Sequence, residues 1–148
     1  MTHAELIKVA AAQLKRWRCL PICTEMVTQN ISGEIPDAIG WTARASILIE
    51  CKASRADFLA DKNKMFRSEF LSYMALGDFR FYFTNPGVVK EKDTLPRGWG
   101  VYEISDGKPK HKFGVRYSNA ANIPCKGNKA SEVVMLRSYI RRKEDERP

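Results

Sequence analysis

Two carboxylates and one lysine lie close together in the chain, in a pattern that can support chemistry. Asp37 follows Pro36, and Glu50 and Lys52 come thirteen and fifteen residues after Asp37, in a segment, 46–53, that is otherwise mostly apolar. Side chains alternate along a strand, so Glu50 and Lys52 share one face, and the other face carries Ile47, Ile49 and Cys51. Charged groups are costly in such a segment, so their presence indicates a polar site on one side of a buried strand.

The chain from Ile35 to Ser54 is predicted to form a β-hairpin. If it reverses at Ala43 and Arg44, antiparallel pairing places Asp37 opposite Glu50, with Cβ atoms roughly 4.5 to 5.5 Å apart. Two carboxylates at that separation repel each other unless a cation lies between them. Mg²⁺ is typically held by one or two carboxylates, and water and phosphate oxygens complete its coordination. With a lysine nearby to orient or deprotonate a water, the pattern favours metal-assisted hydrolysis of a phosphodiester. The alternative is an ordinary ion pair of Glu50 with Lys52 or Arg44 on a solvent-facing sheet.

This spacing resembles the PD-(D/E)xK signature of the restriction-endonuclease-like nuclease superfamily. Over roughly residues 25–104, the chain is also similar to the MmcB-like DNA repair proteins and their phage relatives, on Glu50, Lys52, Ser54, Asp57-Phe58, Asp61-Lys62 and the run 80–83. The resemblance implies a restriction-endonuclease-like core and DNA as the partner. It also implies Mg²⁺ or Mn²⁺ held by Asp37, Glu50 and the Cys51 carbonyl, with Lys52 positioning the attacking water.

A further acidic ligand is expected upstream of the hairpin. Glu25, on the first predicted strand, resembles the extra acidic residue that many of these nucleases use near the metal. Glu34 is the alternative, ranked lower because strand periodicity places it off the Asp37 face.

Several side chains are candidates for nucleic-acid contact. In the resembling family the helix after the hairpin borders the substrate, which makes Lys62, Lys64 and Arg67 candidate phosphate ligands. Ser54 either caps that helix or serves the site through its hydroxyl. Arg44 and Trp41 lie at the hairpin tip, where the indole either stacks on a base or covers the sheet edge.

The remaining pattern predicts an α/β fold with an αβββαβ core, a mixed sheet flanked by helices, a short β extension and a C-terminal helix. Helices are expected over 4–17, from just after Ser54 to Gly77, and over 131–142. Strands are expected over 19–28, in both hairpin arms, and over 79–84, 100–104 and 108–117. The helix between the second hairpin arm and the strand 79–84 makes those two strands parallel.

Length and composition are typical of one ordinary globular domain, and the resemblance implies that residues 1–148 form a single nuclease-like domain. The chain has 44% hydrophobic residues and a net charge of +8, and residues 61–148 contain 18 basic and 11 acidic groups. A positive surplus suits a polyanionic partner. The four cysteines have no C-x-x-C spacing, which argues against zinc. With no apolar run long enough for a membrane span, we expect a cytoplasmic protein.

Two other functions remain open at this stage. One is a nucleic-acid-binding accessory module that keeps the fold without cutting, and the other is a structural protein with an ion-paired sheet. A homodimer would make cleavage of both strands of a duplex easier.

Overall fold

A computed structural model describes residues 1–64, 67–68, 70–120 and 122–148. Within these ranges, a capping side chain marks the start of each of three α-helices. Thr2 caps α1 (His3–Arg16) and forms a capping box with Glu5. Ser54 accepts the amide N–H of Asp57 at the start of α2 (Arg55–Asp61). Asn128 accepts the amide N–H of Ser131 at the start of α3 (Lys129–Asp145). These bonds satisfy amide groups that a helix start otherwise leaves unpaired.

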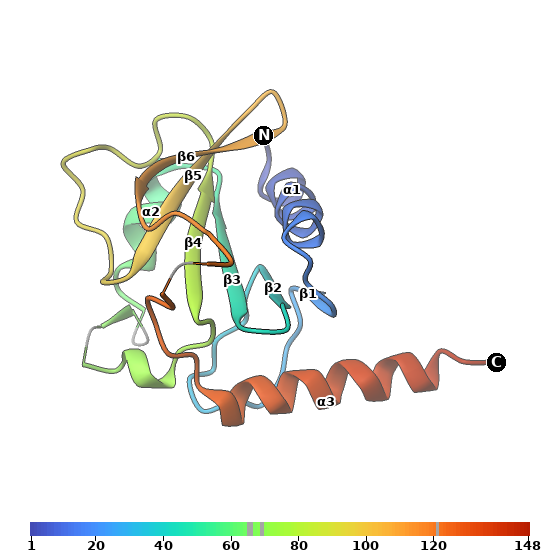
Figure 1. The fold of residues 1–148 in the computed structure, drawn as a ribbon. Coiled ribbons are helices and arrows are strands. Elements are labelled where there is room, and N and C mark those ends of the chain that lie inside the picture. The colour runs from blue at the N-terminus through green and yellow to red at the C-terminus, as the bar shows by residue number, and fades with distance from the viewer. Residues whose placement is uncertain (65–66, 69, 121) are drawn as a thin grey trace.

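The strands form one six-stranded mixed sheet in which the order in space equals the order in the chain. Its members are β1 (Ile22–Thr24), β2 (Ala38–Trp41), β3 (Ser46–Lys52), β4 (Phe79–Thr84), β5 (Trp99–Ser105) and β6 (Lys108–Gly114). The pairs β1–β2, β2–β3 and β5–β6 are antiparallel, whereas β3–β4 and β4–β5 are parallel. The fold is therefore α/β with helices flanking a mixed sheet (Figure 1), and the predicted parallel pairing of the strands 46–52 and 79–84 is confirmed.

The hairpin has the predicted register. Ala38 pairs with Ile49 and Gly40 with Ile47, so one further step along the ladder sets Asp37 opposite Glu50. The tip is a turn closed by Thr42, whose amide N–H donates to the Ala45 carbonyl at 2.8 Å. Thr42, a residue type that does not by itself predict a turn, thus closes the reversal that positions the site.

Alternation along β3 separates two hydrophobic clusters. Ile47, Ile49 and Cys51 pack on the face that α1 covers, together with the phenylalanines of β4. Leu48 belongs to the opposite cluster, which includes Phe58 of α2 and Met135 of α3. Glu50 and Lys52 follow Leu48 on that second face, at the end of β3 nearest α2. The prediction of a core side and a polar side is confirmed.

The structure corrects several predicted boundaries. α2 ends at Asp61, and the described residues of the expected continuation to Gly77 include the 3-10 turn η2 (Ser72–Met74) where an α-helix was predicted. The parts of that predicted helix at 65–66 and 69 lie outside the described residues. β1 is three residues long because Glu25 adopts a positive φ of 49° directly after it. β6 ends at Gly114, which has φ 69°, so the strand predicted to reach residue 117 is shorter.

The C-terminal helix is longer than predicted. Met135 is fully buried and Tyr139 packs beside it against the same cluster, whereas Ile140 is 55% exposed. In Figure 1 the second half of α3 extends away from the sheet, which explains this exposure. No helix in the described ranges is both long and apolar enough to cross a membrane.

Candidate functional site

A hollow of about 420 Å³ lies at the end of β3, beside α1 and α2. Its lining includes the polar residues His3, Asp37, Glu50, Lys52, Asp61 and Lys64. The hairpin register, the alternation of β3 and the start of α2 together bring these side chains to one place. The three residues with which the sequence analysis began therefore share one cavity.

Asp37 is held in place by the opposite strand. Its Oδ2 accepts the amide N–H of Cys51 at 2.7 Å, and its Oδ1 lies 3.2 Å from His3 Nε2. The sequence analysis did not assign His3, and no local pattern links it to Asp37, because the contact depends on how α1 docks against the hairpin. The His3 side chain is 46% exposed, so it can move away from the carboxylate without disturbing the core.

Glu50 is buried beside Asp37. Burial raises its pKa to about 8; Arg67 opposes this shift, while Asp37 and Glu34 add to it. Among the described residues, Glu50 Oε1 accepts no hydrogen bond, and it lies 3.5 Å from Arg67 Nη2. A buried carboxyl oxygen in this position has lost its hydration without full compensation, so a bound cation would supply the missing partner.

Lys52 faces the same hollow and is oriented by α2. Its Nζ lies 3.0 Å from Asp61 Oδ1, and the lysine side chain is only 9% exposed. Asp61 Oδ2 accepts the hydroxyl of Tyr82 from β4. Although burial alone would raise the pKa of Asp61, the charge of Arg67, the Tyr82 hydroxyl and Lys52 lower it below its usual range. Asp61 is thus a permanently ionised group that fixes the direction of Lys52, a role that the sequence analysis missed.

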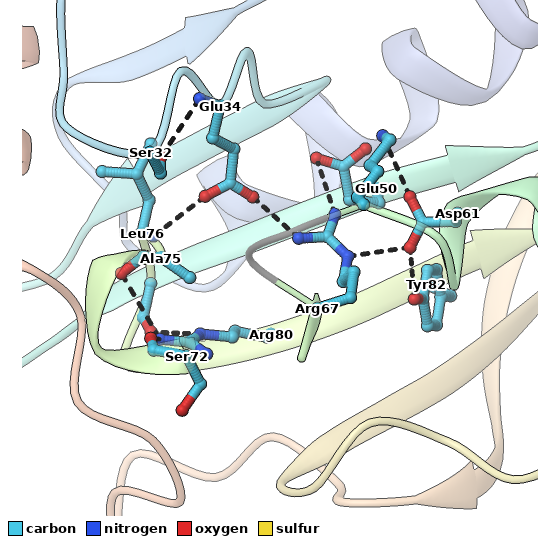
Figure 2. Close-up of polar contacts among 12 residues, drawn as sticks. Ser32, Glu34, Glu50, Asp61, Arg67, Ser72, Ala75, Leu76, Arg80 and Tyr82 are labelled. Atoms are coloured by element: carbon cyan, nitrogen blue, oxygen red, sulfur yellow. Dashed lines mark hydrogen bonds and ion pairs between the residues drawn. The ribbon is translucent and has the colours of Figure 1, made fainter. Parts of the chain in front are cut away.

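Arg67 lies at the centre of a buried network of carboxylates (Figure 2). Its guanidinium contacts Glu34 at 3.0 Å, Asp61 at 2.8 Å and Glu50 at 3.5 Å, and its side chain is 1% exposed. It also lies over the Trp99 ring, 4.4 Å from the centroid. The expectation that Arg67 contacts phosphate from the surface is corrected, because this guanidinium is the internal counter-ion of the site.

The two upstream glutamates occupy different environments. Glu25 is exposed at the end of β1, and its amide N–H donates to the Asp37 carbonyl at 3.1 Å. Glu34 is 1% exposed, and its carboxylate accepts the amide N–H of Leu76 as well as the Arg67 guanidinium. Glu34 therefore joins the buried network around Glu50, whereas Glu25 borders the site through its backbone.

The predicted nucleic-acid contacts separate into two groups. Lys62, at the C-cap of α2, and Lys64, in the turn after it, are exposed, and Lys64 Nζ lies 3.0 Å from Asp61 Oδ1 in the hollow. Ser54 is exposed and caps α2, as expected. Arg44 lies at the far end of β3, away from the hollow, with its guanidinium on the Ser118 carbonyl. Trp41 covers the sheet edge, and its Nε1 donates to Glu132 of α3 at 3.1 Å.

The donors present fit a hard divalent cation. Asp37, directly before β2, and Glu50 of β3 supply carboxylate oxygens, the Cys51 carbonyl directly follows Glu50 in the chain, and Glu50 Oε1 has no hydrogen bond among the described residues. Mg²⁺ commonly takes only one or two carboxylates and keeps several waters. In the described ranges, no group of three or more His, Cys, Asp or Glu side chains could hold a metal ion. Two carboxylates suffice for such an ion when water and substrate oxygens complete its coordination.

Comparison with known proteins supports the fold alone. No family model matches the chain, and no curated protein matches it. A solved structure of a protein of unknown function from Silicibacter pomeroyi, SPO1766, is similar, with a TM-score of 0.62 and 19% sequence identity. The match covers 97% of this chain and 90% of that chain. The six-stranded α/β arrangement is therefore shared with another protein along nearly the whole length of the chain.

Proposed function

We propose that this protein is a metal-dependent nuclease that hydrolyses phosphodiester bonds in DNA, on a restriction-endonuclease-like core. The observation that carries the proposal is the convergence of Asp37, Glu50 and Lys52 in one hollow, with the two acids on paired strands. The similarity to MmcB-like proteins supports a role in DNA repair, recombination or phage DNA processing.

Each side chain has a distinct role in this proposal. Asp37 and Glu50, with the Cys51 carbonyl, would hold Mg²⁺ or Mn²⁺, and Glu25, whose backbone bonds to Asp37, is the further acidic residue of the proposal. When bound, the ion supplies charge stabilisation and lowers the pKa of water. Lys52, directed by Asp61, positions the attacking water and donates to the phosphate. Ionisation of Glu50 is coupled to metal binding, because a carboxyl whose pKa is raised to about 8 exchanges its proton for the cation.

A nucleic-acid-binding module that does not cut is the second candidate. It is favoured by the ion pairs that engage two of the three groups, Lys52 with Asp61 and Asp37 with His3. Such a module would bind DNA equally well with and without divalent metal.

Cleavage assays distinguish the two candidates. Supercoiled plasmid, duplex and single-stranded oligonucleotides are incubated with Mg²⁺, Mn²⁺ or EDTA, using the wild-type protein and the variant Lys52→Ala. Lys108→Ala is the matched control, because it removes an exposed lysine from β6, away from the hollow. We expect metal-dependent cutting by the wild type and by Lys108→Ala, and none by Lys52→Ala.

If folded Lys52→Ala cuts as fast as the wild type, the role of Lys52 in positioning the attacking water is wrong. The absence of cutting in any metal, together with DNA binding that EDTA does not change, would establish the accessory module instead.

A further inference from the structure

A second hollow, of about 750 Å³, lies at the opposite end of β3. Its walls come from the end of α1, the turn between β2 and β3, and the segment that follows β6. In Figure 1 that segment leaves β6 and crosses back over the sheet, and Tyr117 packs against Phe79 of β4 at 5.1 Å between ring centroids. Three parts of the chain that are far apart in sequence thus meet around this cavity.

The hollow is strongly cationic. Four arginines line it: Arg16, Arg18, Arg44 and Arg116. No Asp or Glu is among its lining residues. In the part of the chain that the structure describes, none of the four forms an ion pair with a carboxylate. All four are exposed. Four like charges around one cavity repel one another, and an anionic ligand would relieve that repulsion.

The geometry of two of these arginines is defined by the backbone around them. The Arg44 guanidinium donates to the Ser118 carbonyl at 3.3 Å, which ties the hairpin turn to the segment after β6. Arg18 has a φ of 65°, an unusual conformation for a residue other than glycine, directly after α1. Backbone strain of this kind persists where the surrounding structure enforces it.

Two aromatic side chains form the apolar part of the cavity. Trp17 and Tyr117 are partly buried, and their ring centroids lie 4.5 Å apart. Aromatic surfaces interleaved with arginines are typical of sites that bind single-stranded nucleic acid, where bases stack and guanidinium groups hold phosphates.

We propose that this arginine hollow binds a single-stranded segment of nucleic acid, independently of the metal site. Arg44 precedes Lys52 by eight residues, which in an extended strand corresponds to roughly 25 Å. The aromatic groups pack on the α1 face of the sheet, whereas Glu50 and Lys52 lie on the other face. The inference goes beyond the proposed nuclease activity, and a protein that does not cut would still show it.

The test measures binding in EDTA, so that metal-dependent cleavage does not contribute. Fluorescence anisotropy of a labelled oligodeoxythymidine is recorded over a range of salt concentrations for the wild type and the double variant Arg16→Ala/Arg116→Ala. The matched control is Arg137→Ala/Arg141→Ala, which removes two exposed arginines from α3. The melting temperature of each variant establishes that it is folded.

We expect the double variant to bind more weakly than the wild type, with a plot of log K against log salt less steep by about 1.4, since each single-strand phosphate contact contributes about 0.7. The α3 control should keep the wild-type slope. Equal slopes for all three proteins would overturn the proposal, as would the absence of wild-type binding at low salt.

Competition separates nucleic acid from a free phosphate ligand. Unlabelled oligodeoxythymidine should displace the probe at far lower phosphate concentration than thymidine monophosphate or inorganic phosphate. Equal displacement by inorganic phosphate would contradict a nucleic-acid site and assign the hollow to small anions. Cleavage by the Asp37 site is assayed in parallel, so that failure of either proposal is recognised separately.

Discussion

Glu50 combines burial, a neighbouring acid and a neighbouring arginine, and these effects act in different directions on its charge. In the unfolded chain this carboxyl titrates near 4.5, and in the folded protein its pKa is about 8, mainly because of burial. Between these pH values the folded state binds more protons than the unfolded state, so Glu50 lowers stability as pH rises through that window. At pH 9 the protein carries the full cost of a buried ionised group.

The variant Glu50→Gln tests this assignment. A neutral amide removes the cost of ionisation, so we expect the free energy of unfolding to exceed that of the wild type at pH 9 by a few kcal/mol, at about 1.4 kcal/mol per pKa unit. The gain should shrink towards zero at pH 5, where Glu50 is protonated in the folded protein. Urea denaturation at the two pH values measures the difference, and a gain that does not change with pH would contradict the raised pKa.

Arg67 is the residue on which the buried acids depend. Replacing it by Met leaves Glu34 and Asp61 without the Arg67 counter-charge, and breaking a buried ion pair in this way costs about 3 to 5 kcal/mol. Lys64→Met is the control, because it removes another partner of Asp61 that is 40% exposed, and it should cost less than about 1 kcal/mol. Urea denaturation at pH 7 compares the two, and equal losses would show that Arg67 has no special structural role.

At the scale of elements, the hairpin was predictable because its information is local. Alternation along 46–52 fixes which side chains face the core, and the turn at Thr42 sets Asp37 against Glu50. The caps Thr2 and Ser54 mark helix starts for the same reason, since each bonds an amide only three residues away.

The region after α2 was not predictable from local pattern. Its residues have helical spacing, yet α2 ends at Asp61, and Arg67 turns inward to meet Glu34 and Glu50. Those carboxylates lie 33 and 17 positions earlier in the chain. The ion pairs that draw Arg67 inward therefore depend on the tertiary fold, and no local pattern predicts them. The contact of His3 with Asp37 is unpredictable for the same reason.

The attachment of α3 gives an element-scale prediction. Buried Glu132 accepts hydrogen bonds from Trp41 at the hairpin end, Ser46 of β3 and the amide N–H of Gly77. Glu132→Ala leaves these donors unpaired, and we expect a loss of about 3 kcal/mol or more in the free energy of unfolding. Glu144→Ala, on the exposed end of the same helix, should stay within about 0.5 kcal/mol of the wild type. Equal effects in urea denaturation would mean that α3 is not anchored by Glu132.

At the scale of the whole molecule, the sheet separates two chemically opposite sites. The acids Asp37, Glu50 and Asp61 gather at one end and on one face of β3, whereas the arginine hollow lies at the other end and on the other face. The net charge of +8 is therefore not spread evenly, because the buried acids contact Arg67 and Lys52, whereas the arginines of the second hollow have no carboxylate partner among the described residues. The two proposed activities, binding of a single strand and cleavage, are thus assigned to separate places on the molecule.

The single-turnover rate of DNA cleavage in Mn²⁺ by Asp37→Asn, compared with the wild type and with Asp106→Asn, tests the central claim most directly. Asn keeps an oxygen that can accept the Cys51 amide N–H, so the fold should be retained, and Asp106→Asn removes an exposed carboxylate in the turn between β5 and β6. Loss of several kcal/mol of charge stabilisation corresponds to a rate decrease of roughly 10³-fold or more for Asp37→Asn. We expect Asp106→Asn to cleave at the wild-type rate. Cleavage by folded Asp37→Asn at that same rate would contradict the account.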